Sequence, residues 1–274
     1  ELPMRLIFAL QQSDSPYNQQ IIDISWLEFS SSLILIALTF FLSFALKLQI
    51  EKSLLLASFR AAVQLLAVGL FFTAIFDHGF SELWSWLWVL FMILLATTII
   101  RRRVPSVRGL SPVALLAILS SVALVIGVIF LLSVIEYTPI NIVVISGITI
   151  GNIVPSAVLA VQQLNLQIIN RRSEVESLLS LGADKKIVTK FLAPQIIKTA
   201  ITTQIERTKV VGLIALPGAM TGLLLAGIEP MDAVLIQLIV MYMILGSATV
   251  TVCILVWFGL KLSFTNDLRL ASEK

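Results

Sequence analysis

Long apolar runs separated by short polar stretches dominate the chain. A bilayer core roughly 30 Å thick requires about 20 mainly apolar residues in one helix, and about seven runs reach that length. They cover residues 26–46, 54–76, 83–100, 112–135, 142–164, 208–228 and 233–260. Polar and apolar residues do not alternate in these runs as they do in barrel strands, so the runs predict helices. The pattern predicts an all-α, polytopic transmembrane helical bundle.

Composition agrees with this class. Of the 274 residues, 58% are hydrophobic and 13% are charged, whereas a soluble domain averages about 25% charged residues. The small net charge of +3 does not indicate nucleic acid as a partner. One cysteine, Cys253, and one histidine, His78, exclude an intrachain disulfide and a His-rich metal site. The composition therefore predicts a lipid-embedded protein and leaves any metal ligands unknown.

The charges give the predicted helices an orientation. With the N-terminus outside, the inner segments hold nearly all Lys and Arg residues, and the outer loops carry acidic ones. The inner basic residues are Lys47, Lys52, Arg101, Arg102, Arg103, Arg108, those within 171–209, Lys261, Arg269 and Lys274. Positive residues favour the cytoplasmic side, so we expect an N-out, C-in protein of the inner or plasma membrane. Its expected parts are an outer segment 1–25, a transmembrane domain 26–264 with an inner loop at about 165–207, and an inner tail 265–274.

The inner loop contains signals for short helices. Ser173 and Glu176 have the spacing of a capping box, and Gly182 is a natural residue to end the helix that follows. Asp184 is placed to cap a second helix, which Pro194 is expected to break or kink. The loop therefore predicts a short helix across the inner face, flanked by longer ones that return to the membrane.

Two interpretations of that short helix stay open. It carries apolar side chains at Val175, Leu178, Leu179 and Leu181, more than a solvated helix needs. This favours a rigid element that docks onto a partner. The alternative is a solvated linker with helical pieces.

Polar residues inside two runs are candidates for a transport pathway. Arg60 and Gln64 lie one turn apart on one helix face, and a charge near the bilayer centre costs about 2.5–3.5 kcal/mol. Arg60 either lines a pathway or reaches back to the inner headgroups, while Gln64 lies deeper. Gly151 follows Gly147 by four residues, a spacing that also serves plain helix packing, and the amide of Asn152 needs a partner.

The last two runs carry a break and a thioether pair. Pro217 and Gly218 interrupt the predicted sixth helix, either as a structural kink or as a hinge that contacts substrate. Gln237 and Met241 lie one turn apart in the seventh. Met220 and Met241 offer soft ligands for a metal, but methionine more often fills gaps in a core.

Several motifs resemble one family, the FetB/YbbM-type ABC permeases, which include bacterial iron-export permeases and plant aluminium-tolerance membrane subunits. The motifs are Arg60-Ala-Ala-Val-Gln64-Leu65 with Gly69, Gly151-Asn152, Leu181-Gly182-Ala183, Lys209-Val-Val-Gly212, and Pro217-Gly218-Ala-Met220-Thr-Gly222, followed by Gly227, Pro230 and Gln237. The stretch from Glu176 to Gly182 also resembles the EAA loop that docks such permeases onto their ATPase. In one departure, Ile153-Val154-Pro155 replaces the family's usual Ala-Met after Gly-Asn, which could alter the pathway lining.

The resemblance implies a permease that acts as a homodimer with a separate ABC ATPase and exports iron or another metal ion. Plant members imply nucleotide sugars or other small solutes as alternative cargo. We expect pathway residues Arg60, Gln64, Gly151, Asn152, Pro217, Gly218, Met220 and Gln237. We expect ATPase-coupling residues Glu174, Glu176, Leu181, Gly182 and Ala183.

The sequence has no Gly-x-x-x-x-Gly-Lys-Ser/Thr phosphate loop. The chain is therefore not expected to be an enzyme or to carry a cofactor, and ATP and Mg would be bound by the partner ATPase. Two other classes are a secondary transporter and a seven-span receptor. Coupling carboxylates are absent from the centres of the apolar runs, which argues against the first, and the short outer loops argue against the second.

Overall fold

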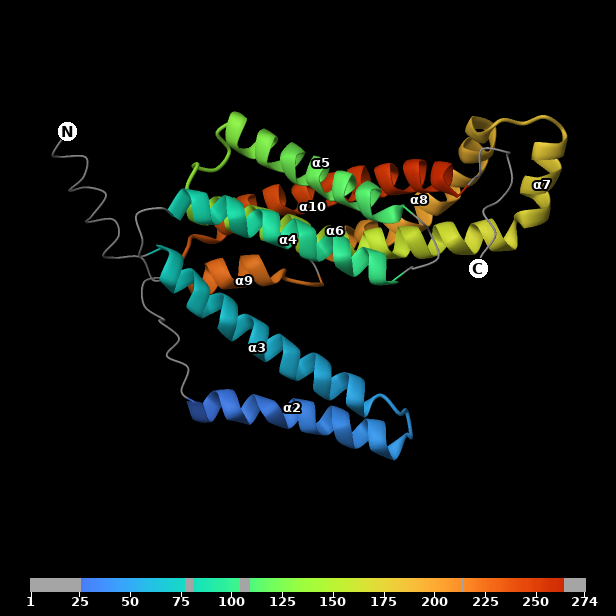
Figure 1. The fold of residues 1–274 in the computed structure, drawn as a ribbon. Helices are drawn as coiled ribbons and strands as arrows, with labels where there is room; N and C mark the ends of the chain where they lie inside the picture. Colours follow the sequence, from blue (N-terminus) through green and yellow to red (C-terminus); the bar gives the residue numbers. More distant parts are fainter. Residues whose placement is uncertain (1–25, 77–80, 104–108, 213, 264–274) are drawn as a thin grey trace. The chain divides into compact units, whose positions relative to one another are not determined.

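Helices form every named element among the described residues, which are 26–76, 81–103, 109–212 and 214–263 in a computed structural model (Figure 1). The helices are α2 (Trp26–Ala45), α3 (Glu51–Phe76), α4 (Ser81–Arg103), α5 (Leu110–Leu131), α6 (Pro139–Asn170), α7 (Arg172–Ser180), α8 (Lys185–Val210), α9 (Gly218–Leu225) and α10 (Pro230–Leu262). The all-α prediction is confirmed. The expected outer segment 1–25 and inner tail 265–274 lie outside the described residues.

Within the described ranges, five helices are long and apolar enough to cross a membrane. They are Glu51–Leu70, Glu82–Arg103, Leu110–Leu131, Pro139–Asn170 and Pro230–Leu262. In α2, a shorter apolar stretch covers Leu33–Ala45. The predicted count of about seven spans is therefore not confirmed, whereas a bundle containing several membrane-spanning helices is.

The sixth predicted span, 208–228, is wrong as a single helix. Helix α8 ends at Val210, and α9 begins only at Gly218. Two residues explain the interruption: Gly212 has a left-handed φ of 94°, and Pro217 disfavours helical geometry in the residue before it. The predicted helix break is present, but it precedes α9 instead of interrupting one long span.

The chain divides into two compact units, each of which is described by itself. The first contains α2, α3 and residues 222–229. Within it, the Ser43 hydroxyl donates a 2.7 Å hydrogen bond to Glu51 Oε1 across the turn between α2 and α3. Lys47 and Gln49 in that turn have positive φ values of 51° and 57°. This unit carries Arg60 and Gln64.

The second unit contains α4 to α8 and α10, and it holds the buried core. Helix α10 packs against α5, α6 and α8, and α6 also packs against α5 and α8. One apolar cluster joins α4, α5, α6 and α10, and a second joins α6, α7, α8 and α10. Helix α7 lies crosswise at the end of this unit, where α6 ends and α8 begins (Figure 1). Helices α6, α8 and α10 therefore position the features described next.

Among the described residues of this unit, two prolines lie in the interior of a long helix, beyond its first turn. Pro155 is within α6, and Pro194 is within α8. Pro194 was expected to break or kink the helix that follows Asp184; the break is absent, because α8 continues through Pro194 to Val210. Its neighbours Leu192, Ala193 and Ile196 are buried in the second cluster, and this packing holds the helix together despite the missing N–H.

Candidate functional site

One residue, Arg171, separates α7 from α6, so α7 begins at Arg172 and not at a capping box. Its N-cap residue is Arg171, without a side-chain capping bond, and Ser173 lies inside the helix. Glu176 instead pairs with Arg172 at 2.8 Å, and the hydrogen bond to this carboxylate holds the pKa of Arg172 above its ordinary value. The capping-box prediction is therefore wrong, because Glu176 pairs with Arg172, one turn earlier, and not with the backbone at Ser173.

The other end of α7 closes as predicted. The N–H of Gly182 donates to the Leu179 carbonyl at 3.1 Å, and that of Ala183 donates to the Leu178 carbonyl at 3.0 Å. These two bonds form a Schellman motif, in which the residue after the helix takes a left-handed conformation. Gly182 does so with a φ of 87°. The chain thus turns sharply at a defined point.

Helix α7 has one anchored face and one free tip. Val175 is fully buried, and Leu178 and Leu179 pack against the cluster that joins α6, α8 and α10. The guanidinium carbon of Arg171 lies 4.3 Å from the centre of the Phe191 ring on α8. Leu181, in contrast, is 85% exposed. Internal packing explains three of the four predicted apolar residues, and Leu181 remains as an exposed leucine beside Gly182.

The expected coupling residues therefore share one small region. Glu174 and Glu176 are exposed on α7, where Glu174 pairs with Arg171 at 2.8 Å. Leu181 and Gly182 are exposed at the tip, and Ala183 is half-buried. The tip is rigid on both sides, because Asp184 directly caps α8.

The predicted cap of α8 is confirmed. The Asp184 side chain accepts a 2.9 Å hydrogen bond from the Ile187 N–H, so α8 starts at Lys185. From there α8 is two-sided: apolar side chains such as Leu192, Ile196 and Ala200 are buried against α6 and α10. The opposite side is polar.

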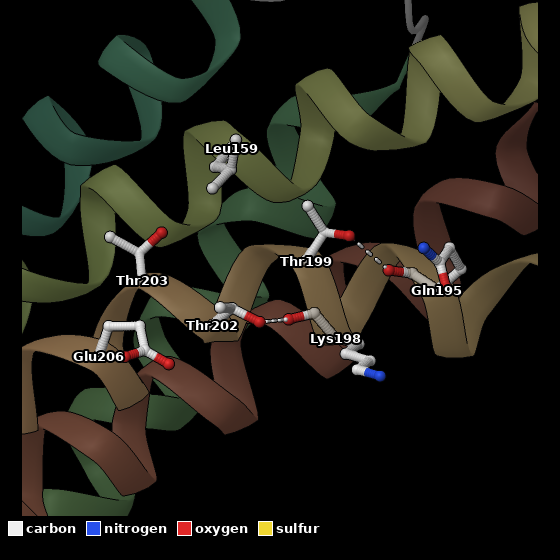
Figure 2. A pocket seen from close by; sticks show the side chains of 7 residues that line it. All are labelled: Leu159, Gln195, Lys198, Thr199, Thr202, Thr203 and Glu206. Atoms are coloured by element: carbon white, nitrogen blue, oxygen red, sulfur yellow. Dashed lines mark hydrogen bonds between the residues drawn. The ribbon is translucent and has the colours of Figure 1, made fainter. Parts of the chain in front are cut away.

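We call that side the α8 polar face and define it as Gln195, Lys198, Thr199, Thr202, Thr203 and Glu206. Together with Leu159 of α6, these residues line a hollow of about 510 Å³ (Figure 2). The hydroxyls of Thr199 and Thr202 donate to the carbonyls of Gln195 and Lys198, at 2.9 and 2.7 Å. Their oxygen atoms can still accept hydrogen bonds from a solute or from water.

Helix α8 is tied to α6 by one buried amide. Gln204 Nε2 donates to the Asn152 carbonyl at 3.0 Å and to Ser156 Oγ at 3.1 Å. The Asn152 side chain donates back to the Ile148 carbonyl of its own helix at 2.8 Å. The amide of Asn152 thus finds its partner within α6, and Gln204 supplies the contact between helices.

The expected pathway residues occupy different surroundings. Gly151 is exposed on α6, with no atom within 4 Å of a Cβ built on it, and Asn152 is half-buried. Gln237 is buried on α10, and its Oε1 has no hydrogen-bond partner among the described residues. Pro217, Gly218 and Met220 lie at the start of α9. Arg60 and Gln64 are exposed on α3, in the other unit.

Sequence reasoning missed Gln204 and the α8 polar face. The signal was present: polar side chains recur every three or four residues from Gln195 to Glu206, and the intervening Ile196, Ala200 and Ile201 are apolar. This is an amphipathic helix pattern. It was assigned to the inner loop because the stretch is too polar to count as an apolar run.

No resident metal centre emerges from the described residues. They contain no group of three or more His, Cys, Asp or Glu side chains placed to hold a metal ion.

Comparisons with known proteins place the chain among membrane proteins. Residues 26–264 match the family described as Uncharacterised protein family (UPF0014). The membrane protein YjkA of Bacillus subtilis is 34% identical over 84% of this chain and 92% of its own length. The "Probable iron export permease protein FetB" of Escherichia coli is 30% identical over 81% and 86%. The "Protein ALUMINUM SENSITIVE 3" of Arabidopsis thaliana is 31% identical over 81% of each chain. No solved structure matches the chain.

Proposed function

We propose, on the premise that this chain belongs to the UPF0014 family of membrane proteins, that it is the membrane-spanning permease subunit of an ATP-driven exporter. A transport permease role is supported by its relatives, one of which is named as an iron export permease. The finer proposal is that a separate ABC ATPase provides the energy.

The free tip of α7 is the observation that carries this proposal. A leucine that is 85% exposed would gain from burial, and it sits where a Schellman turn and the Asp184 cap fix the backbone. Because Val175 anchors α7 to α6, α8 and α10, a push on the tip would be transmitted to those three helices. We therefore assign Leu181 and Gly182 to the docking surface for the ATPase, with Glu174, Glu176 and Ala183 around it.

The assembly that follows is a homodimer bound to two ATPase subunits. The N-terminus lies outside the cell or compartment, and the basic ends of α4 and α10 face inward with α7. In this orientation the docking tip is on the side where ATP is available.

The proposed cargo is iron or another metal ion, with a nucleotide sugar or another small solute as the alternative. Metal export rests on the name of the Escherichia coli relative. The expected pathway residues are those given above, of which Gly151 and Asn152 lie on α6 beside α8.

The test uses the permease co-expressed with a tagged ABC ATPase subunit from the same cell and reconstituted into liposomes. Gly182→Pro cannot adopt a φ of 87°, because the proline ring fixes φ near −65°. It should leave membrane insertion intact and abolish stimulation of ATP hydrolysis by iron(II) or by a nucleotide sugar. Gly182→Asn is the matched control, since asparagine tolerates positive φ.

A second pair of variants isolates the exposed leucine. Leu181→Asp should reduce co-purification of the ATPase at least about tenfold, which corresponds to 1.4 kcal/mol. Ile169→Asp, which changes another exposed apolar residue at the end of α6, should not. Equal ATPase recovery and hydrolysis in all four variants would exclude docking at this tip.

A further inference from the structure

The position of α8 along α6 is fixed by Gln204. Its side chain bonds to Asn152 and Ser156, which lie near the middle of the apolar run 142–164. Helix α6 has 32 residues, so it is roughly 48 Å long and exceeds a bilayer core of about 30 Å. The part of α8 around Gln204 therefore lies beside the membrane-spanning part of α6, well inside its predicted inner end.

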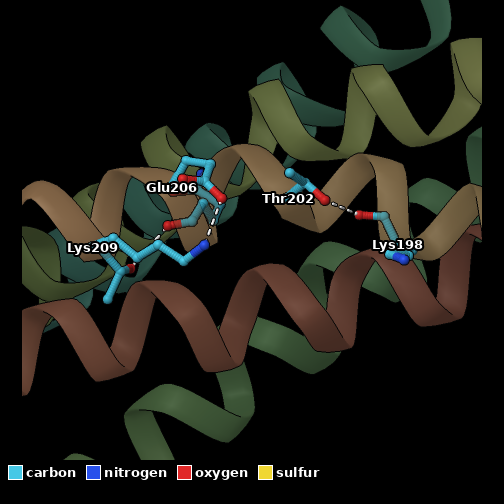
Figure 3. Close-up of polar contacts among 6 residues, drawn as sticks. Lys198, Thr202, Glu206 and Lys209 are labelled. Atoms are coloured by element: carbon cyan, nitrogen blue, oxygen red, sulfur yellow. Dashed lines mark hydrogen bonds and ion pairs between the residues drawn. The ribbon is translucent and has the colours of Figure 1, made fainter.

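The outward side of α8 at this depth is too polar for lipid. Thr202 and Thr203 are exposed there, and one turn further on Glu206 pairs with Lys209 at 2.8 Å, with 59% and 62% of their side chains exposed (Figure 3). A charged side chain at the bilayer centre costs about 2.5–3.5 kcal/mol and almost always faces water or protein. The α8 polar face is therefore expected to meet water or protein, and not lipid tails.

Helix α6 borders the α8 polar face with an exposed side of its own. Gly151, Pro155 and Leu159 follow each other at intervals of four residues and so lie on one helix face. Leu159 lines the hollow, and Gly151 and Pro155 are exposed. Because proline has no N–H, the Gly151 carbonyl loses its usual donor and is available to water or solute. The small Gly151 and Pro155 and the released Gly151 carbonyl suit a surface along which a solute moves.

We propose that the α8 polar face, with Gly151 and Pro155 of α6, forms one wall of a water-filled route through the membrane for a hydrophilic solute. This rests on the proposed permease function and identifies where its route runs. It also moves the inner boundary of the membrane domain, because the part of α8 from about Gln195 onward leaves the predicted inner loop and enters the bilayer region.

The wall has a charge preference. This side of α8 carries one net positive charge, because it bears two lysines, Lys198 and Lys209, and one glutamate, Glu206. Glu206 is already paired with Lys209, whereas Lys198 makes no ion pair with the described residues and borders the hollow. The route therefore favours solutes that bear carboxylate or phosphate groups, including a metal ion carried as an anionic complex, over a bare cation.

The first experiment measures water access to single thiols in liposomes that contain the permease alone. The native thiol is removed by Cys253→Ala, and Thr202→Cys or Thr203→Cys reports on the wall. Leu119→Cys on α5 is the matched control. It is exposed and apolar, and Ser121, two residues on, bonds to Thr251 of α10. Leu164 of α6 and Gly259 of α10 approach closely. Ser156 and Thr251 each lie eight residues earlier in the same two helices, so they are at about the same level.

A membrane-impermeant maleimide should modify Thr202→Cys and Thr203→Cys at least about tenfold faster than Leu119→Cys. Labelling in detergent after denaturation checks that each thiol is present. Equal, slow labelling at all three sites would show a dry face, and equal, fast labelling would show that this level of both α5 and α8 lies outside the membrane. Either result overturns the route. Because no ATPase is present, the outcome is separate from any failure of the coupling proposal.

The second experiment tests the charge preference with two thiosulfonate reagents of opposite charge on Thr202→Cys. After correction for their rates with a free thiol, the anionic reagent should react about threefold faster than the cationic one, because Lys198 is one turn away. Lys198→Glu should reverse that order. Lys190→Glu, about 18 Å from Thr202 along the helix, should leave it unchanged. If Lys198→Glu leaves the ratio of the anionic to the cationic reaction rate unchanged, the proposed charge preference is wrong.

Discussion

Helices α5 and α8 both pack against α6 and α10, yet their outward faces are opposite in character. α5 turns Leu116, Leu119 and Leu124 outward, whereas α8 turns Lys198, Thr202 and Glu206 outward. A lipid environment suits the first helix and not the second. The difference shows that burial against neighbours does not reveal what a membrane helix faces on its other side. The chemistry of the exposed side chains does.

The inward faces of the same two helices resemble each other. Each is held by polar contacts within apolar packing: the Ser121 hydroxyl of α5 donates to the Ser247 carbonyl at 3.2 Å and lies 2.7 Å from Thr251 Oγ1. On α8, Gln204 plays the corresponding part toward Asn152 and Ser156. The comparison therefore separates groups that hold the bundle together from groups that face a solute.

The largest effect is expected when one charge is placed on each outward face. Leu119→Lys puts an ammonium group on the apolar side of α5 and should cost about 2.5–3.5 kcal/mol of insertion free energy. Thr202→Lys adds the same group to a face that already carries Lys198, and should cost little. Recovery of folded protein from membranes and its unfolding in mixed micelles measure both. Equal losses would mean that the two faces share one environment.

The next effect concerns the inward face of α8. Gln204→Leu removes the donor to both the Asn152 carbonyl and Ser156 Oγ, and we expect a loss of about 1–3 kcal/mol in the free energy of unfolding. Gln195→Leu, on the exposed side, should change it by less than about 0.5 kcal/mol. Denaturation in mixed micelles gives both values. Similar values for the two variants would contradict the assignment of inward and outward faces.

A smaller effect is expected on the inward face of α5. Ser121→Ala should destabilise the bundle by about 1 kcal/mol, because the Ser121 hydroxyl is fully buried. Thr251→Val should do likewise, and the double variant should lose less than the sum, with a coupling of about 0.5 kcal/mol or more. Strict additivity would show that the 2.7 Å contact contributes nothing.

Local chemistry made parts of the fold predictable. The end of α7 at Gly182 and the cap of α8 at Asp184 depend on neighbouring residues only, and both are confirmed. Where two local interactions compete, the prediction failed: Arg172 takes Glu176 away from Ser173. Of the break or kink expected at Pro194, the break is absent, because buried neighbours hold α8 intact. Such outcomes depend on packing energy, which spacing does not report.

The candidate site divides in the same way. The tip at Leu181 could be located from sequence because its helix end is a local motif. The contact between Gln204 and Asn152 joins residues 52 positions apart, and no periodicity indicates such a pair. The α8 polar face was overlooked for another reason. A helix with one polar side has a low mean hydropathy, so a search for apolar runs rejects it. The other side of α8 nevertheless packs in the apolar core with α6 and α10.

The smallest expected effect completes the comparison. Thr202→Val keeps the branched shape and removes only the hydroxyl, whose hydrogen bond runs to the Lys198 carbonyl within the same helix. Its loss should change the free energy of unfolding by less than about 0.5 kcal/mol, clearly below the change for Ser121→Ala on the inward face of α5. The same micelle denaturation measures both. If Thr202→Val lowers the free energy of unfolding as much as Ser121→Ala does, Thr202 contributes to packing. Its hydroxyl would then not be free to contact water and solute, as the α8 polar face requires.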